Sequence, residues 1–159
     1  MSVARELANL VGTPTNGNIL LQSTAGDALD GTGTCNIAAG LNALGAATSG
    51  DDNVAIGRLA LGAGVTTGND NIAIGYEALG GAINGGEFNL AIGNYVLDAN
   101  TAGDYNVALG NQAMSANTSG SSNLAIGHVA LGSNTSGAYN IGIGQTTLNG
   151  NTTGARNIA

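Results

Sequence analysis

A motif of the form G-x-x-N-[VIL]-[AG]-[IAL]-G recurs at a nearly constant interval along most of this 159-residue chain. Its asparagine falls at Asn36, Asn53, Asn71, Asn89, Asn106, Asn123, Asn140 and Asn157. A period this short and regular is typical of a solenoid, in which each coil stacks on the last and cannot bury its apolar face alone. The sequence therefore predicts an all-β fold, a parallel β-solenoid or β-roll with one motif in each coil.

Within each repeat, apolar residues stand one and three positions after the asparagine, as in Val54 and Ile56, with an alanine such as Ala55 between them. This spacing predicts a short strand with both aliphatic side chains on one face. The other face carries almost no side chain, and we expect it to accept another backbone or chain at close range. A later column predicts a second short strand, at Leu44, Leu61, Leu79, Leu97, Met114, Leu131 and Leu148.

The asparagine and glycine positions of the repeat predict structural roles. We expect the asparagines to form a ladder in which side-chain amides bond the adjacent coil or the local backbone, and the alternative is a part in ligand binding. The glycine four residues later predicts a corner that needs positive φ or a very close approach. These structural repeat residues are Asn53, Gly57, Asn71, Gly75, Asn89, Gly93, Asn106, Gly110, Asn123, Gly127, Asn140 and Gly144.

The chain divides into a non-repeat segment, residues 1–32, and a repeat region, residues 33–159. The repeat region holds seven repeats and the start of an eighth. In the first segment, residues 3–11 are compatible with a short helix, residues 12–17 with a turn, and residues 19–21 with a strand. A helix this short needs a partner surface, so we interpret residues 1–32 as an attachment segment.

Composition argues against several classes of partner. The chain has 10 acidic residues, three arginines and a net charge of −7, so it has little positive charge with which to bind phosphates. We therefore expect no nucleic acid and no membrane insertion. No apolar run is long enough for a membrane-spanning helix, and the first residues do not match a secretory signal peptide. The single cysteine, Cys35, gives no sign of a disulfide framework.

The motif N-[VI]-A-I-G-x-x-A-L, present at residues 53–61 and 71–79, resembles the head repeats of trimeric autotransporter adhesins and the related repeats of bacteriophage tail fibres. The resemblance covers residues 33–159, and it implies a left-handed parallel β-roll assembled as a homotrimer. The autotransporter repeat is shorter than the repeat of this chain, and the [NVA]-T-[ST]-G turn that closes most repeats here is, in its N-T-T-G form, more similar to the phage-fibre version.

Three aromatic residues and one histidine are candidate surface contacts. Phe88, Tyr105 and Tyr139 all precede a repeat asparagine, so they would form either an aromatic strip for sugars or part of a subunit seam. His128 lies in a variable column and is expected to be exposed. Three copies of it on a trimer axis would be a hypothetical metal site, but no further ligand stands at a suitable spacing. Cys35, in the aromatic column, is either a tolerated small residue or an interchain crosslink.

We expect no enzymatic activity and no cofactor. Glu77, Glu87 and Asp98 supply the carboxylates that a glycosidase needs as a pair, but they fall in different columns and are interpreted as solvated surface charges. One histidine, one cysteine and no lysine leave little material for nucleophilic or general-base catalysis.

Three functions remain. The first is a virion tail fibre, a structural trimeric shaft that is assembled in the host cytoplasm, attached to tail, baseplate or adaptor proteins through residues 1–32, and serves host attachment through a distal receptor-binding region. The second is a bacterial surface adhesin. The third is a secreted filament or an ice-binding solenoid, suggested by a threonine column that includes Thr118 and Thr135. We favour the first, and since the last repeat stops at Ala159 in mid-coil, we expect a longer fibre of which this is the tail-proximal part.

Overall fold

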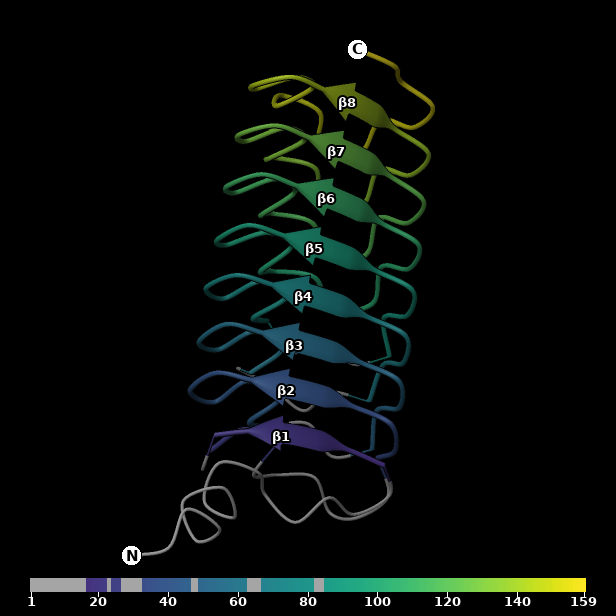
Figure 1. Ribbon diagram of the computed structural model, residues 1–159. Coiled ribbons are helices and arrows are strands. Elements are labelled where there is room, and N and C mark those ends of the chain that lie inside the picture. Colours follow the sequence, from purple (N-terminus) through teal and green to yellow (C-terminus); the bar gives the residue numbers. More distant parts are fainter. Residues whose placement is uncertain (1–16, 23, 27–32, 47–48, 63–66, 82–84) are drawn as a thin grey trace, which may run out of the picture.

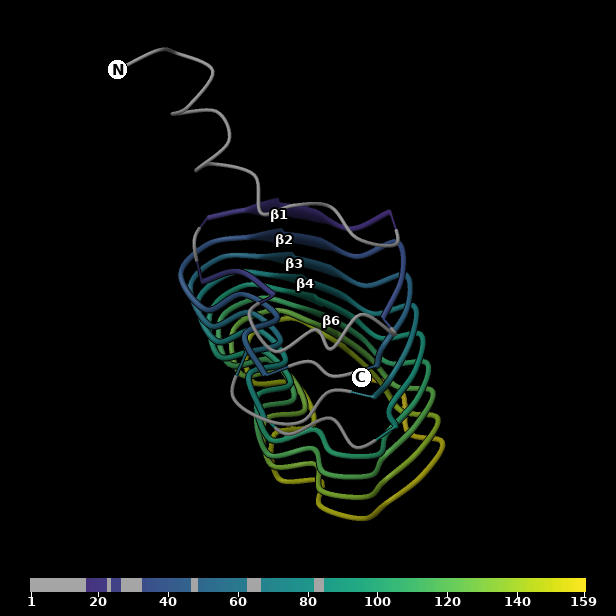
Figure 2. The ribbon, with the colours of Figure 1, turned by 90° about the horizontal axis from the view of Figure 1, so that it is seen from below.

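The computed structural model describes residues 17–22, 24–26, 33–46, 49–62, 67–81 and 85–159. In these residues, short strands stack into one parallel sheet whose order follows the sequence (Figure 1). The strands are β1 (Ile19–Leu21), β2 (Ile37–Ala39), β3 (Val54–Ile56), β4 (Ile72–Ile74), β5 (Leu90–Ile92), β6 (Val107–Leu109), β7 (Leu124–Ile126) and β8 (Ile141–Ile143). Seen from below, successive coils lie over one another with a gradual offset (Figure 2).

The sheet keeps one register from coil to coil. Ala55 of β3 pairs with Ala73 of β4, and Ala73 pairs with Ala91 of β5. Paired residues occupy the same position of successive repeats, so each step to the next strand moves one full coil along the chain. The predicted all-β parallel solenoid is confirmed.

The sheet extends into the segment that lacks the full sequence motif. β1 pairs with β2, Ile19 lying opposite Ile37. Asn18 stands at the place of a repeat asparagine, since its Oδ1 accepts a hydrogen bond from the backbone N of Asn36 at 2.7 Å. The strand expected at residues 19–21 is therefore present. The expected helix at residues 3–11 lies outside the described residues, as does nearly all of the turn at residues 12–17.

The core is a thin layer between the alanine column of the strands and the leucine column that follows them. The alanines are fully buried at Ala38, Ala55, Ala73, Ala91, Ala108 and Ala125. The leucine column and the residue before it complete the same cluster. The prediction that the alanine face accepts another chain is wrong, because this face points into the coil. Only a methyl group is accommodated there, since leucine side chains fill the space inside the coil.

The second strand predicted in each coil is also wrong. The leucine column lies in turns or bends, with φ between 48° and 52° from Leu44 to Leu148. This left-handed backbone bends the chain sharply and directs a large side chain such as that of Leu97 into the core. A left-handed leucine is unfavourable for an L-residue, and glycine or asparagine is the usual sequence signal for it. The recurring apolar column therefore does not mark a second strand.

Two further columns share this left-handed conformation. One is the residue before the repeat asparagine, with φ of 56° to 60° from Cys35 to Arg156. The other lies two residues before the leucine column, with φ of 53° to 59°, and includes Gln112. Together with the corner glycine, these columns produce the bends that close each coil.

The repeat asparagines form a buried hydrogen-bonded ladder, which Asn106 illustrates. Its backbone N donates to Asn89 Oδ1 at 3.0 Å, and its Nδ2 donates to the same oxygen at 3.1 Å and to the Gly120 carbonyl at 2.8 Å. Its own Oδ1 accepts from the N and Nδ2 of Asn123, each at 3.1 Å. Each amide thus connects its own coil to both neighbours, and it also bonds the turn that closes a coil.

The corner glycines meet both conditions expected of them. Gly75 has φ of 134°, and a Cβ placed on it would lie 2.2 Å from the Gly93 carbonyl oxygen. Gly110 has φ of 131°, and its Cβ would lie 2.6 Å from the Gly127 carbonyl oxygen. Coils approach so closely at this corner that no side chain fits between them.

Candidate functional site

The outer face of the sheet is a continuous apolar surface. Its two aliphatic columns, one and three residues after each repeat asparagine, point away from the alanine core. Ile56 is 41 %, Ile92 40 % and Ile143 56 % exposed. The eight described strands contain no charged residue. With parallel strands about 4.8 Å apart, the face is about 34 Å long, and an apolar patch of this kind usually marks an interaction surface.

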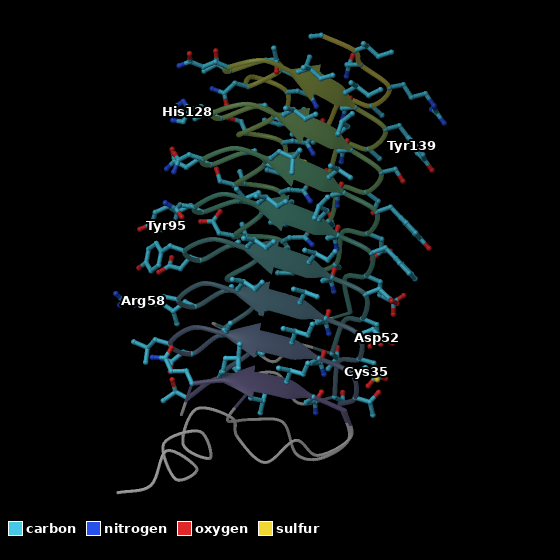
Figure 3. The ribbon with its side chains drawn as sticks, viewed as in Figure 1. Cys35, Asp52, Arg58, Tyr95, His128 and Tyr139 are labelled. Carbon is cyan, nitrogen blue, oxygen red and sulfur yellow. The ribbon has the colours of Figure 1, made fainter. Side chains whose placement is uncertain are left out.

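Side chains of different character line the two edges of this face (Figure 3). Cys35, Asp52 and Tyr139 lie along the edge where the strands begin. Arg58, Tyr95 and His128 lie along the opposite edge, beyond the corner glycines. The sequence-predicted surface residues are therefore divided between two edges, and His128 is not near the aromatic column.

The structure brings the aromatic column together in part. The rings of Phe88 and Tyr105 stack, with centroids 5.0 Å apart and planes 4° from parallel. Tyr139 lies two coils beyond Tyr105, with Ser122 between them, and the guanidinium of Arg156 lies 5.3 Å from its ring centroid. Tyr105 and Tyr139 are 59 % and 57 % exposed, so this edge presents aromatic rings to solvent.

A second aromatic group, which is not apparent from the sequence, lies on the other edge. Tyr76 and Tyr95 meet edge to face at 5.1 Å, and the guanidinium of Arg58 lies 5.4 Å from the Tyr76 ring. Hydrogen bonding to Glu77, and then to Tyr95, raises the pKa of the Tyr76 hydroxyl to about 12. The two tyrosines occupy adjacent columns of the repeat, so a search for aromatics within one column does not pair them.

The three candidate carboxylates do not form one site. Glu77 lies close enough to Asp98 to act on it electrostatically, and burial, followed by Glu77, raises the pKa of the Asp98 carboxyl. Asp98 Oδ1 is buried without a hydrogen-bond partner among the described residues. Glu87 is in a different column, where its Oε1 accepts from Asn69 Nδ2 at 3.1 Å. Glu87 therefore occupies a different place in the repeat from Glu77 and Asp98.

His128 is exposed, as its variable column predicts. Within the described ranges, no three His, Cys, Asp or Glu side chains are grouped so that they would hold a metal ion. Cys35 is exposed and has a free thiol. The hypothesis of a metal on a trimer axis therefore gains no support from a second ligand within one chain.

The threonine column forms a ladder of its own in the later coils. Thr101, Thr118 and Thr135 each donate their hydroxyl to the carbonyl of the next threonine in the column, at 3.0 Å. A parallel ladder of asparagines, at Asn100, Asn117, Asn134 and Asn151, lies beside it. These hydroxyl protons are thus used within the fold, which leaves the oxygen lone pairs and the methyl groups for any external contact.

Among the residues that the structure describes, none belongs to a helix with the length and apolar character needed to cross a membrane. Comparisons with protein-family models, with curated proteins and with solved structures found no match to this chain.

Proposed function

We propose that this chain is a structural virion protein, the shaft of a homotrimeric tail fibre that serves host adhesion. The observation that carries the proposal is the outer face of the sheet, which is a continuous apolar surface. The recurrent polar side chains of the fold are already hydrogen-bonded within internal ladders. The resemblance of the repeat to those of phage fibres and trimeric adhesins supports the same assignment.

The apolar face favours assembly of several copies. Its aliphatic columns, which include Ile74 and Ile92, repeat on every strand and are partly exposed in the single chain. Covering them removes apolar surface from water at roughly 25 cal/mol per Å². Because the columns have the same spacing along the axis in every copy, parallel copies match coil for coil. A threefold axis parallel to the solenoid would bury all three faces at once.

The use of the polar side chains favours a structural role over a catalytic one. The amide of Asn106 donates two bonds and accepts two, which fills the ladder positions on both sides. The recurrent hydroxyls bond backbone carbonyls in the same manner. Each coil therefore uses its recurrent polar groups to hold its neighbours, and variation is confined to the edges.

Sedimentation velocity at micromolar concentration tests the assembly. We expect the wild-type mass to be three times that of one chain. Ile92→Glu places a charge in the middle of the apolar face and should reduce the mass to that of a monomer. Gln112→Glu adds the same charge at an exposed corner away from the face and should leave the trimer intact. A stable wild-type monomer would contradict the proposal.

Gold-labelled antibodies against this chain, observed by electron microscopy, test the location. Labelled tail fibres on virions, together with inhibition of phage adsorption by the antibodies, are the expected results. Labelling of the surface of uninfected bacteria would favour the bacterial adhesin and overturn the virion assignment.

A further inference from the structure

We propose that the gap between Tyr105 and Tyr139, above Ser122, is a binding slot for one neutral pyranose ring of a carbohydrate. This inference goes beyond the fibre role proposed above and does not depend on trimer formation, because the slot lies along one edge of a single solenoid. It concerns a site within one column of the repeat, where the rings project to solvent.

The two tyrosines each have one covered ring face. Phe88 stacks on Tyr105 from the preceding coil, with planes 4° from parallel. Arg156 lies over Tyr139 from the following coil, 5.3 Å from the ring centroid. The uncovered face of each tyrosine is therefore the one on the side of Ser122. The two free faces lie on either side of the same short side chain.

The width of the gap fits a saturated sugar ring. Tyr105 and Tyr139 are two coils apart, which corresponds to about 9.6 Å at about 4.8 Å per coil. Carbon atoms in contact lie about 3.5 to 4.0 Å apart, so a flat aromatic group between two rings fills only about 7 to 8 Å. A pyranose chair is thicker than an aromatic ring because its hydrogens project above and below the ring, and it would contact both tyrosines.

The polar groups around the slot suit sugar hydroxyls. Ser122 offers a hydroxyl at its base, and Asp104 and Ser121 lie in the adjacent column, hydrogen-bonded to each other through Asp104 N and Ser121 Oγ at 3.1 Å. Asp104 Oδ1 also accepts from the backbone N of Glu87 at 2.9 Å. Carboxylate and hydroxyl oxygens accept bonds from sugar hydroxyls, and the negative charge of Asp104 disfavours an anionic sugar. The ligand class is therefore a neutral hexopyranose.

The column itself supplies a variant that closes the slot. Tyrosine is already accommodated at Tyr105 and Tyr139 with φ of 56° and 59°, and Ser122 has φ of 59°. A ring at residue 122 would continue the stack already formed by Phe88 and Tyr105. Ser122→Tyr should therefore fold normally and fill the gap, whereas Ser122→Ala keeps the gap open and is the matched control.

Binding of methyl glycosides of glucose, galactose, mannose and N-acetylglucosamine at millimolar concentration tests the proposal. Saturation-transfer NMR reports contact, and tyrosine fluorescence reports affinity because the chain has four tyrosines and no tryptophan. We expect at least one glycoside to bind the wild-type protein. Ser122→Tyr and Tyr139→Ala should each weaken binding about tenfold or more, while Ser122→Ala should change it less than about twofold.

Three binding results would overturn the slot. The first is that none of the four glycosides binds, and the second is that Ser122→Tyr binds as well as the wild-type protein. The third is that methylguanidinium binds where the glycosides do not, which would indicate a planar cation as the ligand. Sedimentation of Ser122→Tyr separates this test from that of the fibre, because an unchanged mass shows that the edge lies outside the subunit contact. A changed mass would place Ser122 in a seam and overturn the inference.

Discussion

In each described coil from Cys35 onward, three residues hold a left-handed backbone although they are not glycine. Each one costs about 1 to 2 kcal/mol relative to the right-handed form, and each is held by a hydrogen bond to a neighbouring coil. The backbone N of Tyr105 donates to Glu87 O at 3.0 Å, that of Gln112 to Asn94 O at 3.0 Å, and that of Met114 to Ala130 O at 3.0 Å. The conformation of a coil thus depends on its neighbours.

The corner glycine tolerates no side chain at all. We predict that Gly110→Val destabilises the protein by about 3 kcal/mol or more, because it combines unfavourable φ with a clash against the next coil. The melting temperature should fall by about 10 °C. Asn111→Val, at the exposed next position, is the control and should shift it by less than about 2 °C. Equal melting temperatures for the two variants would show that the corner is elsewhere.

Asp98 gives stability a dependence on pH. Burial raises the pKa of its carboxyl above the ordinary value of 3.8. The stability that the fold gains from a protonated carboxyl, relative to a charged one, is therefore fully present below pH 3.8. The contribution is lost as pH rises through the folded-state pKa, because the charged form is poorly solvated in the fold. Asp98→Asn should therefore raise the melting temperature at pH 7 by about 2 °C.

The same substitution should have no stabilising effect at pH 3, where the wild-type carboxyl is protonated in both states. Asp104→Asn should lack this gain at pH 7, because the Oδ1 of Asp104 accepts a hydrogen bond from a backbone N. Thermal melts of both variants at pH 3 and pH 7 check these expectations. A gain for Asp98→Asn that is equal at pH 3 and pH 7 would show that titration of the carboxyl is not its cause.

The residue-level interpretation was accurate where the backbone requirement has one chemical solution. At positions such as Gly75, only glycine satisfies both the positive φ and the close approach, so the sequence reports the structure directly. The left-handed Leu97 carries no such signal, because its side chain suits the core and its backbone is enforced by neighbouring coils. The gap between Tyr105 and Tyr139 likewise becomes apparent only when ring contacts are known.

The asparagine ladder is the main polar connection between coils. We predict that Asn106→Ala costs about 3 kcal/mol, because it leaves the Asn123 backbone N buried without its partner and removes one of the two side-chain hydrogen bonds to the Gly120 carbonyl. The melting temperature should fall by about 10 °C. Asn111→Ala, which loses only a 3.4 Å bond at the surface, is the control. A similar loss for the two variants would indicate that the ladder adds little to stability.

At the level of strands, the repeat period determined the stacking but not which face is inside. A strand such as Val54–Ile56 has its aliphatic residues on one face and its alanine on the other, and the usual expectation is that the larger apolar residues are buried. Here the coil is too thin for that arrangement. Its interior is filled from the opposite side by Leu61, and the strand contributes only Ala55. The larger side chains are left for the outer face.

The solenoid should tolerate the loss of one complete coil. Deleting residues 106–122 joins Tyr105 to Asn123 and restores the motif in phase. We expect this variant to keep the circular dichroism of the parent and to melt cooperatively within about 5 °C of it, since each coil contacts only its neighbours. Deleting residues 106–113 puts the ladders out of phase and should abolish the cooperative transition. Failure of the in-phase variant to fold would contradict this independence of coils.

The asparagine ladder also gives the stack a direction, and this limits how two copies can meet. The amide oxygen of Asn106 accepts only from the coil that follows, whereas its amide nitrogen donates both to Asn89 in the coil before and to the Gly120 carbonyl. A coil end that exposes a ladder oxygen extends the ladder only if the next coil end supplies hydrogen-bond donors to that oxygen. If two identical ends faced each other across a twofold axis, the ladder oxygen of one copy would meet the ladder oxygen of the other. A head-to-tail contact between two copies would continue the ladder in this direction, and by its symmetry such a heterologous contact would produce open filaments instead of closed dimers.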